Sequence, residues 1–381
     1  MIYLDYAAST PMSKQALDVY TKLAAEVFAN TESLHDSGTT AKGILEKCRA
    51  EVAGMIAAEP KGLYFTSGGT ESNILAISSL LKGSKHKGKH ILSIKSEHSS
   101  ILNLLNKLEH EDGYEVTYLP LNDKGILSPD VLEKSIRNDT VLAAIQHASG
   151  ETGAVQDIET IGDILNKKGV MFHCDAVQSF GKIKTDVKKA HITSLSVSSH
   201  KVYGPKGVGA CYISPSASIN PLIPGTVHEG GLRPGTINLP GIGAFTAAAS
   251  ERIKIMDESY KLMDAIRNKF IDLIKNSSYP IAIESDPSST LPYVLALRIK
   301  GLEGQLVMLS ANQKGLAIST GSACQIGHQE PSKTLLAMGR KKDEARELIR
   351  LSFGHDTDNN TVHKAFDIIK EVIEEYSFQV K

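Results

Sequence analysis

Short apolar runs alternate with amphipathic segments along the first 250 residues of the chain. Runs that are typical of buried strands occur at 62–66, 90–94, 141–145 and 170–174. Between these runs, apolar residues recur at spacings of three and four, which predicts helices over 73–81, 99–108, 129–136 and 158–168. Strands that alternate with helices in this way form a largely parallel sheet with crossover helices. This part of the chain is therefore predicted to be an α/β domain.

The pattern changes after a stretch rich in proline and glycine at 221–243. Helical periodicity then predominates, and it predicts helices over 246–275, 304–314, 343–349 and 361–376. A strand-like run at 293–299 adds a sheet to this second part. We therefore expect a large α/β domain followed, from about residue 250, by a smaller α+β domain, an arrangement that suits a chain of 381 residues.

The charge balance and the cysteine positions narrow the functional classes. Lysine and arginine total 42 against 43 aspartate and glutamate residues, so the net charge of −1 indicates no nucleic-acid partner and favours a small-molecule one. The N-terminus lacks a basic start followed by an apolar run, and no apolar run reaches about eighteen residues, which predicts a cytoplasmic protein without a membrane partner. The cysteines lie far apart without a CxxC pair, which argues against a metal site and a disulfide framework.

Lys201 follows a strand-like run at 194–198 and precedes a turn at Gly204 and Pro205. The ends of strands are where open α/β sheets bind their ligands. A lysine at this place is either a solvated turn residue or a Schiff-base lysine, whose amine becomes nucleophilic when burial or a neighbouring cation lowers its pKa. His200 beside it fits either an anion ligand or a structural turn residue. These residues alone leave both interpretations open.

A glycine-rich turn, Ser67 to Thr70, leads from a predicted strand into a predicted helix. Such a turn leaves backbone N–H groups free at the helix N-terminus, where they and the helix dipole favour a phosphate dianion. Thr70 adds a hydroxyl donor. The alternative interpretation is a simple helix N-cap, so the turn by itself indicates a phosphate site only moderately.

Two further polar side chains follow predicted strands. Asp175 closes the run at 170–174, where a carboxylate can face a protonated pyridine nitrogen through a charge-assisted hydrogen bond. His98 comes just after the run at 90–94, where an imidazole can stack on a flat cofactor and move protons near neutral pH. Each residue has a purely structural alternative, because aspartate and histidine also occur as helix caps.

Cys324 lies in a segment of small residues, Ser319 to Gly327, which favours a reachable thiol over a buried one. A reactive cysteine works as a thiolate, and since its free pKa is about 8.5 it needs positive charge or a basic neighbour. Cys211 lies in an apolar run and is expected to be buried.

Taken together, these segments resemble the cysteine desulfurases, a branch of the class V aminotransferase family of fold type I enzymes that use pyridoxal phosphate. The resemblance extends from Tyr3 to Gly354, essentially the whole chain. The segments that carry it are Thr-Ser-Gly-Gly-Thr-Glu-Ser, Ser-Glu-His, Asp-Ala-Val-Gln, Ser-Ser-His-Lys-Val-Tyr-Gly-Pro-Lys-Gly, Arg-Pro-Gly-Thr and Gly-Ser-Ala-Cys. Six such segments in one order are specific, whereas each alone is not.

The resemblance implies a large cofactor-binding domain, residues 15–250, built on a mainly parallel seven-stranded sheet. It also implies a small α+β domain formed by residues 1–14 and 251–381, which carries the catalytic cysteine loop.

The implied cofactor contacts fall on residues of the quoted segments. Lys201 would bind pyridoxal phosphate covalently and move protons with His98, which stacks on the ring. Asp175 would pair with the ring nitrogen and Gln178 would meet the ring oxygen. The phosphate would be held by the turn that includes Gly69, and by Thr70, Ser198, His200 and a partner subunit's copy of Thr236, so that a homodimer with shared sites is expected.

The implied reaction removes sulfur from L-cysteine. Arg350 would hold the substrate carboxylate, with Asn30 beside it, and the Cys324 thiolate would take the sulfur as a persulfide and leave L-alanine. A sulfur-acceptor protein of iron–sulfur cluster assembly or of tRNA thiolation would then receive it.

Two departures from the family pattern stand out. Many relatives have Asn-Asn-Glu where this chain has Ser149-Gly150-Glu151, so the side-chain amide expected at position 150 is missing. The residues after Cys324, 325–328, also differ from the serine- and alanine-rich continuation of many relatives, which points to a different acceptor.

Two alternatives remain beside the desulfurase interpretation. One is another pyridoxal phosphate lyase or aminotransferase of the same family, such as a selenocysteine lyase, and Cys324 discriminates against it. The other is a non-catalytic scaffold, for which Gly150 is the only argument.

Overall fold

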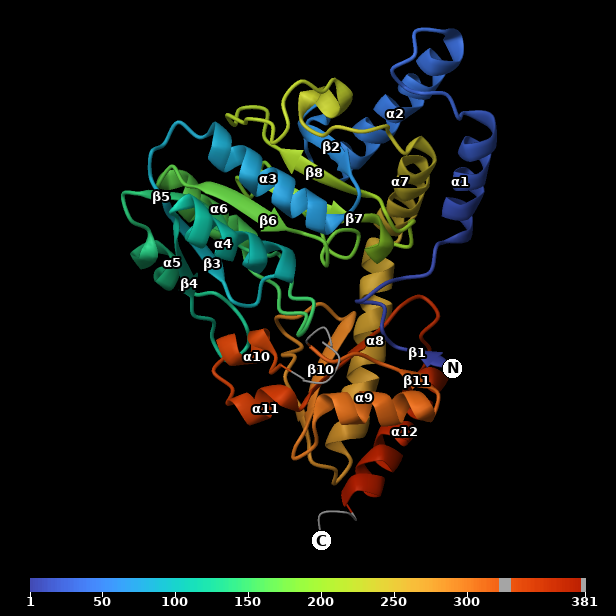
Figure 1. The fold of residues 1–381 in the computed structure, drawn as a ribbon. Coiled ribbons are helices and arrows are strands. Elements are labelled where there is room, and N and C mark those ends of the chain that lie inside the picture. The colour runs from blue at the N-terminus through green and yellow to red at the C-terminus, as the bar shows by residue number, and fades with distance from the viewer. Residues whose placement is uncertain (322–329, 378–381) are drawn as a thin grey trace.

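A computed structural model describes residues 1–321 and 330–377, and a seven-stranded sheet forms its larger part (Figure 1). The strand order is β2-β8-β7-β6-β5-β3-β4. Six of the strands run in the same direction. The seventh, β8, runs in the opposite direction and pairs antiparallel with both of its neighbours, β2 and β7. The strands are β2 Leu63–Thr66, β3 His90–Ile94, β4 Glu115–Leu119, β5 Thr140–Ala144, β6 Met171–Asp175, β7 Ser194–Ser198 and β8 Gly209–Ile213.

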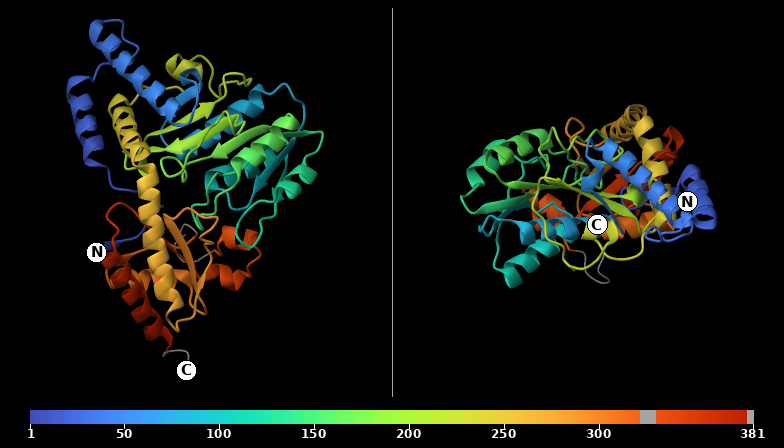
Figure 2. Two further views of the ribbon diagram at one scale, coloured as in Figure 1. Left: turned by 180° about the vertical axis from the view of Figure 1, so that it is seen from behind. Right: turned by 90° about the horizontal axis from the view of Figure 1, so that it is seen from above.

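Helices cover both faces of this sheet, and each face has its own hydrophobic core (Figure 2). One core contains apolar side chains of α3 (Gly69–Gly83) and α4 (Ser99–Asp112). The other contains side chains of α2 (Asp36–Met55), α5 (Pro129–Ser135), α6 (Ile158–Lys167) and α7 (Leu239–Lys254), and α1 (Lys14–Glu26) packs on the outside of α7. The predicted α/β architecture with crossover helices is confirmed.

The C-terminal part is built on a three-stranded antiparallel sheet in the order β12-β10-β9. Its core is formed with long helices and includes Leu4 of the N-terminal segment. The elements are α8 Met256–Lys275, β9 Ile281–Ile283, β10 Val294–Ile299, α9 Gly304–Gln313, α10 Lys333–Ala337, α11 Lys342–Arg346, β12 Leu348–Ser352 and α12 Asn359–Ser377. The boundaries near residues 15 and 250 stay predictions, although α7 packs in the large core and α8 in the small one.

Two predicted elements of the C-terminal part are wrong in detail. The helix expected over 343–349 ends at Arg346, and the chain continues as the fully buried strand β12 from Leu348. Pairing with β10 decides this, because five consecutive buried residues satisfy their backbone groups across the sheet. The helix expected over 246–275 is interrupted at Ile255, where α7 ends and α8 begins.

The N-terminal segment connects the two parts. β1 (Ile2–Tyr3) pairs parallel with β11 (Leu316–Ala317), and Leu4 then exchanges backbone hydrogen bonds with Ala317 and Ser352. The following residues lie against the end of β7, where Lys201 contacts the carbonyl groups of Ala7 and Ala8. Within the described residues, no helix is long and apolar enough to cross a bilayer.

A buried ion pair ties the loop before α7 to the large sheet. Arg49 of α2 donates from Nη1 and Nη2 to the carboxylate of Glu229 at 2.7 and 2.8 Å, and the Phe65 backbone N–H donates to the same carboxylate at 2.6 Å. The Glu229 side chain is only 1% exposed. This contact holds the loop that contains Arg233 and Thr236 against β2.

Replacing Glu229 with alanine is expected to lower the free energy of unfolding by about 3 kcal/mol, because among the described residues it leaves the buried Arg49 with Glu46 as its only carboxylate partner. Urea unfolding of the variant measures this loss. The matched control is Glu59→Ala, which removes an exposed pair with Lys61 and is expected to change the stability by less than about 1 kcal/mol. Equal losses in the two variants would contradict a clamping role for Glu229.

Candidate active site

Three segments that are far apart in the sequence meet at the carboxyl ends of β6 and β7. The turn before α3 approaches so closely that a Cβ on Gly69 would lie 2.7 Å from Val177 Cγ2, which excludes a larger residue there. The same Cβ would lie 3.7 Å from Ser198 Cβ, so the third segment borders the turn as well. The structure therefore brings together the glycine-rich turn, the Asp-Ala-Val-Gln segment and the segment that contains Lys201.

The N-terminus of α3 has no side-chain cap. Its N-cap residue is Gly68, whose φ of 153° suits glycine, and in the part of the chain that the structure describes no side chain caps the first turn. Thr70 in this turn is exposed, and Ser198 is buried beside it. Free backbone N–H groups at a helix N-terminus bind anions well. The simple N-cap interpretation of the turn therefore lacks its expected hydrogen bond, whereas the anion interpretation fits.

His200 comes two residues after Ser198, which borders this turn, and is half-buried. Burial, with help from Lys201, Lys206 and Lys182, lowers the pKa of its imidazole to about 4. The ring is therefore neutral at physiological pH and keeps one N–H donor. Its Nδ1 lies 3.3 Å from Ser9 Oγ.

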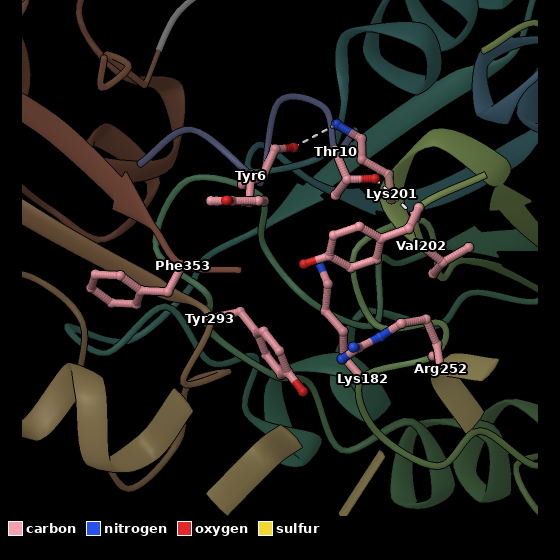
Figure 3. Close-up of a pocket in the computed structure, with 11 residues that line it drawn as sticks. Tyr6, Thr10, Lys182, Lys201, Val202, Arg252, Tyr293 and Phe353 are labelled. Carbon is pink, nitrogen blue, oxygen red and sulfur yellow. Dashed lines mark hydrogen bonds between the residues drawn. The ribbon is translucent and has the colours of Figure 1, made fainter. Parts of the chain in front are cut away.

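Lys201 occupies the short helical turn Ser199–Lys201 that follows β7. Its Nζ donates to the carbonyl oxygen of Ala7 at 2.5 Å (Figure 3) and to that of Ala8 at 2.8 Å. Burial, and after it the charge of Arg350, lower the pKa of this amine to about 8. A substantial fraction of neutral, nucleophilic amine is then present near physiological pH, which favours an active amine over a solvated turn lysine.

Asp175 is buried at the end of β6 and is held from two sides. One carboxylate oxygen accepts from Asn73 Nδ2 at 2.8 Å, and the other accepts from the Val177 backbone N–H at 2.9 Å. Asn73 Nδ2 also donates to Ser100 Oγ at 3.0 Å. These contacts fix the carboxylate and connect it to the start of α4.

His98 is the N-cap residue of α4, and its exposed ring continues this network. Its Nδ1 accepts from the Ser100 backbone N–H at 3.2 Å and lies 2.9 Å from Ser100 Oγ. The structural alternative for His98, a helix cap, is thus present. Because Nδ1 accepts the capping bond, Nε2 carries the ring proton in the neutral form and faces away from the cap. The catalytic role of His98 stays a prediction.

Arg350 lies on β12 and is buried next to the N-terminal segment. It donates to Asp5 Oδ1 and to the Gly150 carbonyl, both at 2.8 Å, while its buried Nε has no partner in the described part of the chain. The backbone of Arg350 also exchanges two hydrogen bonds with Ser319. Ser319 stands shortly before residues 322–329, which the structure does not describe. Cys324 belongs to these residues and so lies outside the described part of the chain.

Gln178 fills the space beside Gly150. Its Nε2 donates to the Ala7 carbonyl at 3.0 Å, and its Oε1 accepts from Lys182 Nζ at 3.3 Å. A Cβ on Gly150 would lie 3.2 Å from Gln178 Nε2, tighter than an ordinary contact. A side chain at position 150 would therefore contact the Gln178 amide already at its first carbon atom.

Replacing Gly150 with asparagine is expected to displace the Gln178 amide and to lower the free energy of unfolding by about 1 to 3 kcal/mol. The control is Gly150→Ala, which adds only the tight Cβ and is expected to lose less than about 1 kcal/mol. Denaturant titration of both variants measures the difference. An asparagine variant as stable as the alanine variant would show that Gln178 moves aside freely.

Two predicted site residues lie apart from this cluster within one chain. Asn30 belongs to the connection between α1 and α2 at the top of Figure 1, whereas Arg350 lies on β12, which pairs with β10 in the lower half. Asn30 is exposed and accepts from the Glu32 backbone N–H at 3.0 Å. Thr236 is exposed on the loop before α7. Their roles stay predictions.

Sequence reasoning did not single out three residues that the structure places in the site: Asn73, Asp5 and Lys182. Asn73 directly follows the Thr-Ser-Gly-Gly-Thr-Glu-Ser segment, one turn into the helix. This position next to the predicted phosphate turn could have indicated that Asn73 belongs to the site. No sequence signal indicates that Asp5 pairs with Arg350, because the contact joins residues at opposite ends of the chain.

Comparisons with known proteins agree with this geometry. The family described as "Aminotransferase class-V" matches residues 2–364. A Bacillus subtilis (strain 168) protein named "Putative cysteine desulfurase NifS" is 46% identical over 359 residues, which cover 94% of this chain and 91% of the relative. The cysteine desulfurase IscS of Dictyoglomus turgidum is 36% identical over 373 residues, which cover 98% of this chain and 94% of the relative.

Solved structures give the same result. A NifS-like protein superposes with a TM-score of 0.90 at 30% identity and covers 99% of both chains. A structure described as SspA in complex with cysteine has a TM-score of 0.81 at 33% identity and covers 93% of this chain and 99% of that one. The chain therefore belongs to the class-V aminotransferase family, in the branch of the NifS-like and IscS-like cysteine desulfurases with the type I fold.

Proposed function

We propose that this protein is a pyridoxal phosphate-dependent cysteine desulfurase, which removes the sulfur of L-cysteine and leaves L-alanine. The observation that carries the proposal is the buried Lys201 amine, with its pKa lowered to about 8, at the meeting point of an uncapped helix N-terminus and a fixed carboxylate. The names of the relatives support the same activity.

The residues of the site fit pyridoxal phosphate. The uncapped N-terminus of α3, Thr70 and Ser198 offer donors to a phosphate, and neutral His200 adds another. Asp175, held by Asn73 and Val177, presents a carboxylate to a protonated ring nitrogen. When bound, the cofactor supplies an electron sink that labilises bonds at the α carbon of an amino acid. Lys201 would hold the cofactor, and its amine would move the substrate's α proton.

The substrate carboxylate is assigned to Arg350. Its guanidinium is oriented by Asp5 and the Gly150 carbonyl, and its buried Nε has no other partner in the described residues. A guanidinium in fixed orientation suits a carboxylate. A related solved structure is described as a complex with cysteine, which supports L-cysteine as the substrate here.

The sulfur is assigned to Cys324. Its thiolate attacks the substrate sulfur, the carbon–sulfur bond breaks, and the electron pair stays on the substrate carbon, which is then protonated to give L-alanine. The sulfur remains on Cys324 as a persulfide, and an acceptor protein of iron–sulfur cluster assembly or tRNA thiolation takes it from there.

A homodimer belongs to the same proposal. The loop that carries Thr236 is anchored to the phosphate turn of its own chain through Arg233, whose guanidinium pairs with Glu71 at 2.8 Å. Thr236 itself is exposed in the single chain. A residue that reaches the phosphate of a partner subunit must be exposed in this way when the partner is not present.

One experiment tests cofactor, substrate and sulfur carrier together. The purified protein is mixed with L-cysteine, alanine is measured, and the persulfide is mapped by mass spectrometry. We expect alanine in step with a persulfide on Cys324. Alanine without that persulfide would favour another lyase of the family. A protein that shows no absorbance of a bound cofactor and forms no alanine would favour the scaffold interpretation.

A further inference from the structure

His173 and Asp175 stand two residues apart on β6, so their side chains lie on the same face of the large sheet. Cys174 between them belongs to the hydrophobic core of the opposite face. α3 packs against β6 and β7 on the face that carries His173 and Asp175 (Figure 1). The alternation along the strand therefore places an imidazole and a carboxylate beside the same helix.

Asn73 of α3 bridges these two side chains with one buried amide. Its Oδ1 lies 3.0 Å from His173 Nε2, and its Nδ2 donates to Asp175 Oδ2 at 2.8 Å. The other ring nitrogen of His173, Nδ1, lies 2.8 Å from the hydroxyl of Ser194 on the neighbouring strand β7. Asn73 is 1% exposed, and His173 and Ser194 are completely buried. Asp175 is thus connected through Asn73 to a histidine in the interior of the sheet.

The charge of Asp175 fixes the direction of each hydrogen bond in this chain. A carboxylate oxygen only accepts, so the NH₂ side of the Asn73 amide faces Asp175 and its carbonyl side faces His173. Burial lowers the pKa of the His173 imidazole to about 3, so the ring is neutral and has a single N–H. This N–H is at Nε2, because Asn73 Oδ1 is an acceptor. Nδ1 then accepts, and the Ser194 hydroxyl donates to it.

The Asn73 amide is therefore held at both of its ends. Without the N–H of His173, its carbonyl oxygen would lose this donor in a buried place, where polar atoms need partners. A rotated amide would direct that oxygen at the carboxylate instead of the NH₂ group. We propose that His173 is a positioning residue, which holds the Asn73 amide so that its N–H donates to the Asp175 carboxylate. The inference rests on the proposed function, in which Asp175 pairs with the ring nitrogen of pyridoxal phosphate.

The expected effect of His173 is on the affinity for the cofactor. A carboxylate in a fixed orientation forms a stronger charge-assisted hydrogen bond with a protonated ring nitrogen than one that can turn. The Val177 backbone N–H still holds Asp175 Oδ1 at 2.9 Å when the contact at Oδ2 is disturbed. Loss of the His173 N–H should therefore weaken cofactor binding and not abolish it.

Two substitutions of similar size separate this hydrogen bond from packing. His173→Gln places an amide N–H where Nε2 donates, whereas His173→Met fills the same space without a donor. Apoprotein of each variant is titrated with pyridoxal phosphate, and the dissociation constant is determined from the absorbance of the bound cofactor. We expect His173→Met to weaken binding at least about tenfold and His173→Gln to stay within about threefold of the wild type.

The matched control is His90→Met. His90 is also completely buried, and its ring nitrogens lie 2.7 Å from the hydroxyl of Thr140 and 2.8 Å from that of Thr117. It stands at the amino end of β3, whereas the proposed site lies at the carboxyl ends of the strands. Its replacement is expected to lower the stability and to leave the affinity for the cofactor unchanged. Urea unfolding of all three variants separates a loss of stability from a loss of affinity.

Neutron diffraction from crystals of the deuterated wild-type holoenzyme covers the case in which a variant does not fold. We expect a deuteron on His173 Nε2 and none on Nδ1, and the reverse would overturn the inference. Equal affinities of His173→Gln and His173→Met, beside a wild type that binds the cofactor, would overturn this inference alone. A wild-type apoprotein that binds no pyridoxal phosphate would overturn the proposed function and this inference with it.

Discussion

Replacing Lys201 with alanine is expected to abolish both the retained cofactor and the formation of alanine from L-cysteine. The wild-type amine is nucleophilic because burial and Arg350 lower its pKa to about 8, and alanine offers no amine at all. The variant loses the covalent attachment and also the group that moves the α proton, so the rate is expected to fall about 10⁴-fold. The absorbance of the bound cofactor and an alanine assay measure the two losses.

Two controls separate chemistry from folding in this prediction. Lys206→Ala removes an exposed lysine of the same turn and is expected to keep the absorbance and the rate. Lys201→Arg keeps a positive charge that can still donate to Ala7 and Ala8 but has no nucleophilic amine, so it is expected to fold and remain inactive. An alanine variant that keeps the cofactor's absorbance unchanged would remove Lys201 from its assigned role.

The strands of the large sheet could be predicted from the sequence because parallel strands are buried on both faces. β3 and β6, for example, are short and almost completely buried segments whose bounds lie within one residue of the predicted ones. α2 escaped prediction because its glycines interrupt the helical pattern. Gly38 is required there by packing, since a Cβ would lie 2.2 Å from the Ser33 carbonyl oxygen, and such a contact has no sequence signature.

The residues of the candidate site could be predicted where they belong to short sequence segments with a recognisable pattern. Lys201 and Asp175 could be predicted because Asp175 ends β6 and Lys201 lies in the turn after β7, and the carboxyl ends of neighbouring parallel strands meet at one edge of the sheet. Asp5 and Lys182 could not be found in this way. Asp5 belongs to the site because it forms an ion pair with Arg350, which lies at the other end of the sequence. Lys182 belongs to it because the fold buries this lysine near other cations.

The geometry around Arg350 bears on the sulfur carrier, because both flanks of residues 322–329 are tied to its neighbours. On one side Ser319 exchanges backbone hydrogen bonds with Arg350. On the other side the Ser332 hydroxyl donates to Glu151, which directly follows Gly150, an acceptor for Arg350. Ser319 and Ser332, which stand before and after residues 322–329 in the sequence, are thus both connected to the surroundings of the proposed substrate anchor.

The other three cysteines are poor nucleophiles. Cys48, Cys174 and Cys211 are free and buried, and burial raises the pKa of each thiol above its ordinary value. Since the thiolate is the reactive form, none of them is suited to attack a substrate sulfur. By this argument the sulfur chemistry rests on Cys324 alone among the cysteines of the chain.

Replacing Cys324 with alanine is expected to lower alanine formation from L-cysteine at least about 10³-fold while leaving the absorbance of the bound cofactor intact, because Lys201 and Asp175 are untouched. The control Cys48→Ala removes a buried thiol of α2 and is expected to keep the rate. The same variant also distinguishes the alternatives. A selenocysteine lyase needs no sulfur carrier, so Cys324→Ala would then release alanine from selenocysteine at the wild-type rate. Loss of activity toward L-cysteine together with loss of the persulfide leaves the desulfurase as the function that accounts for both.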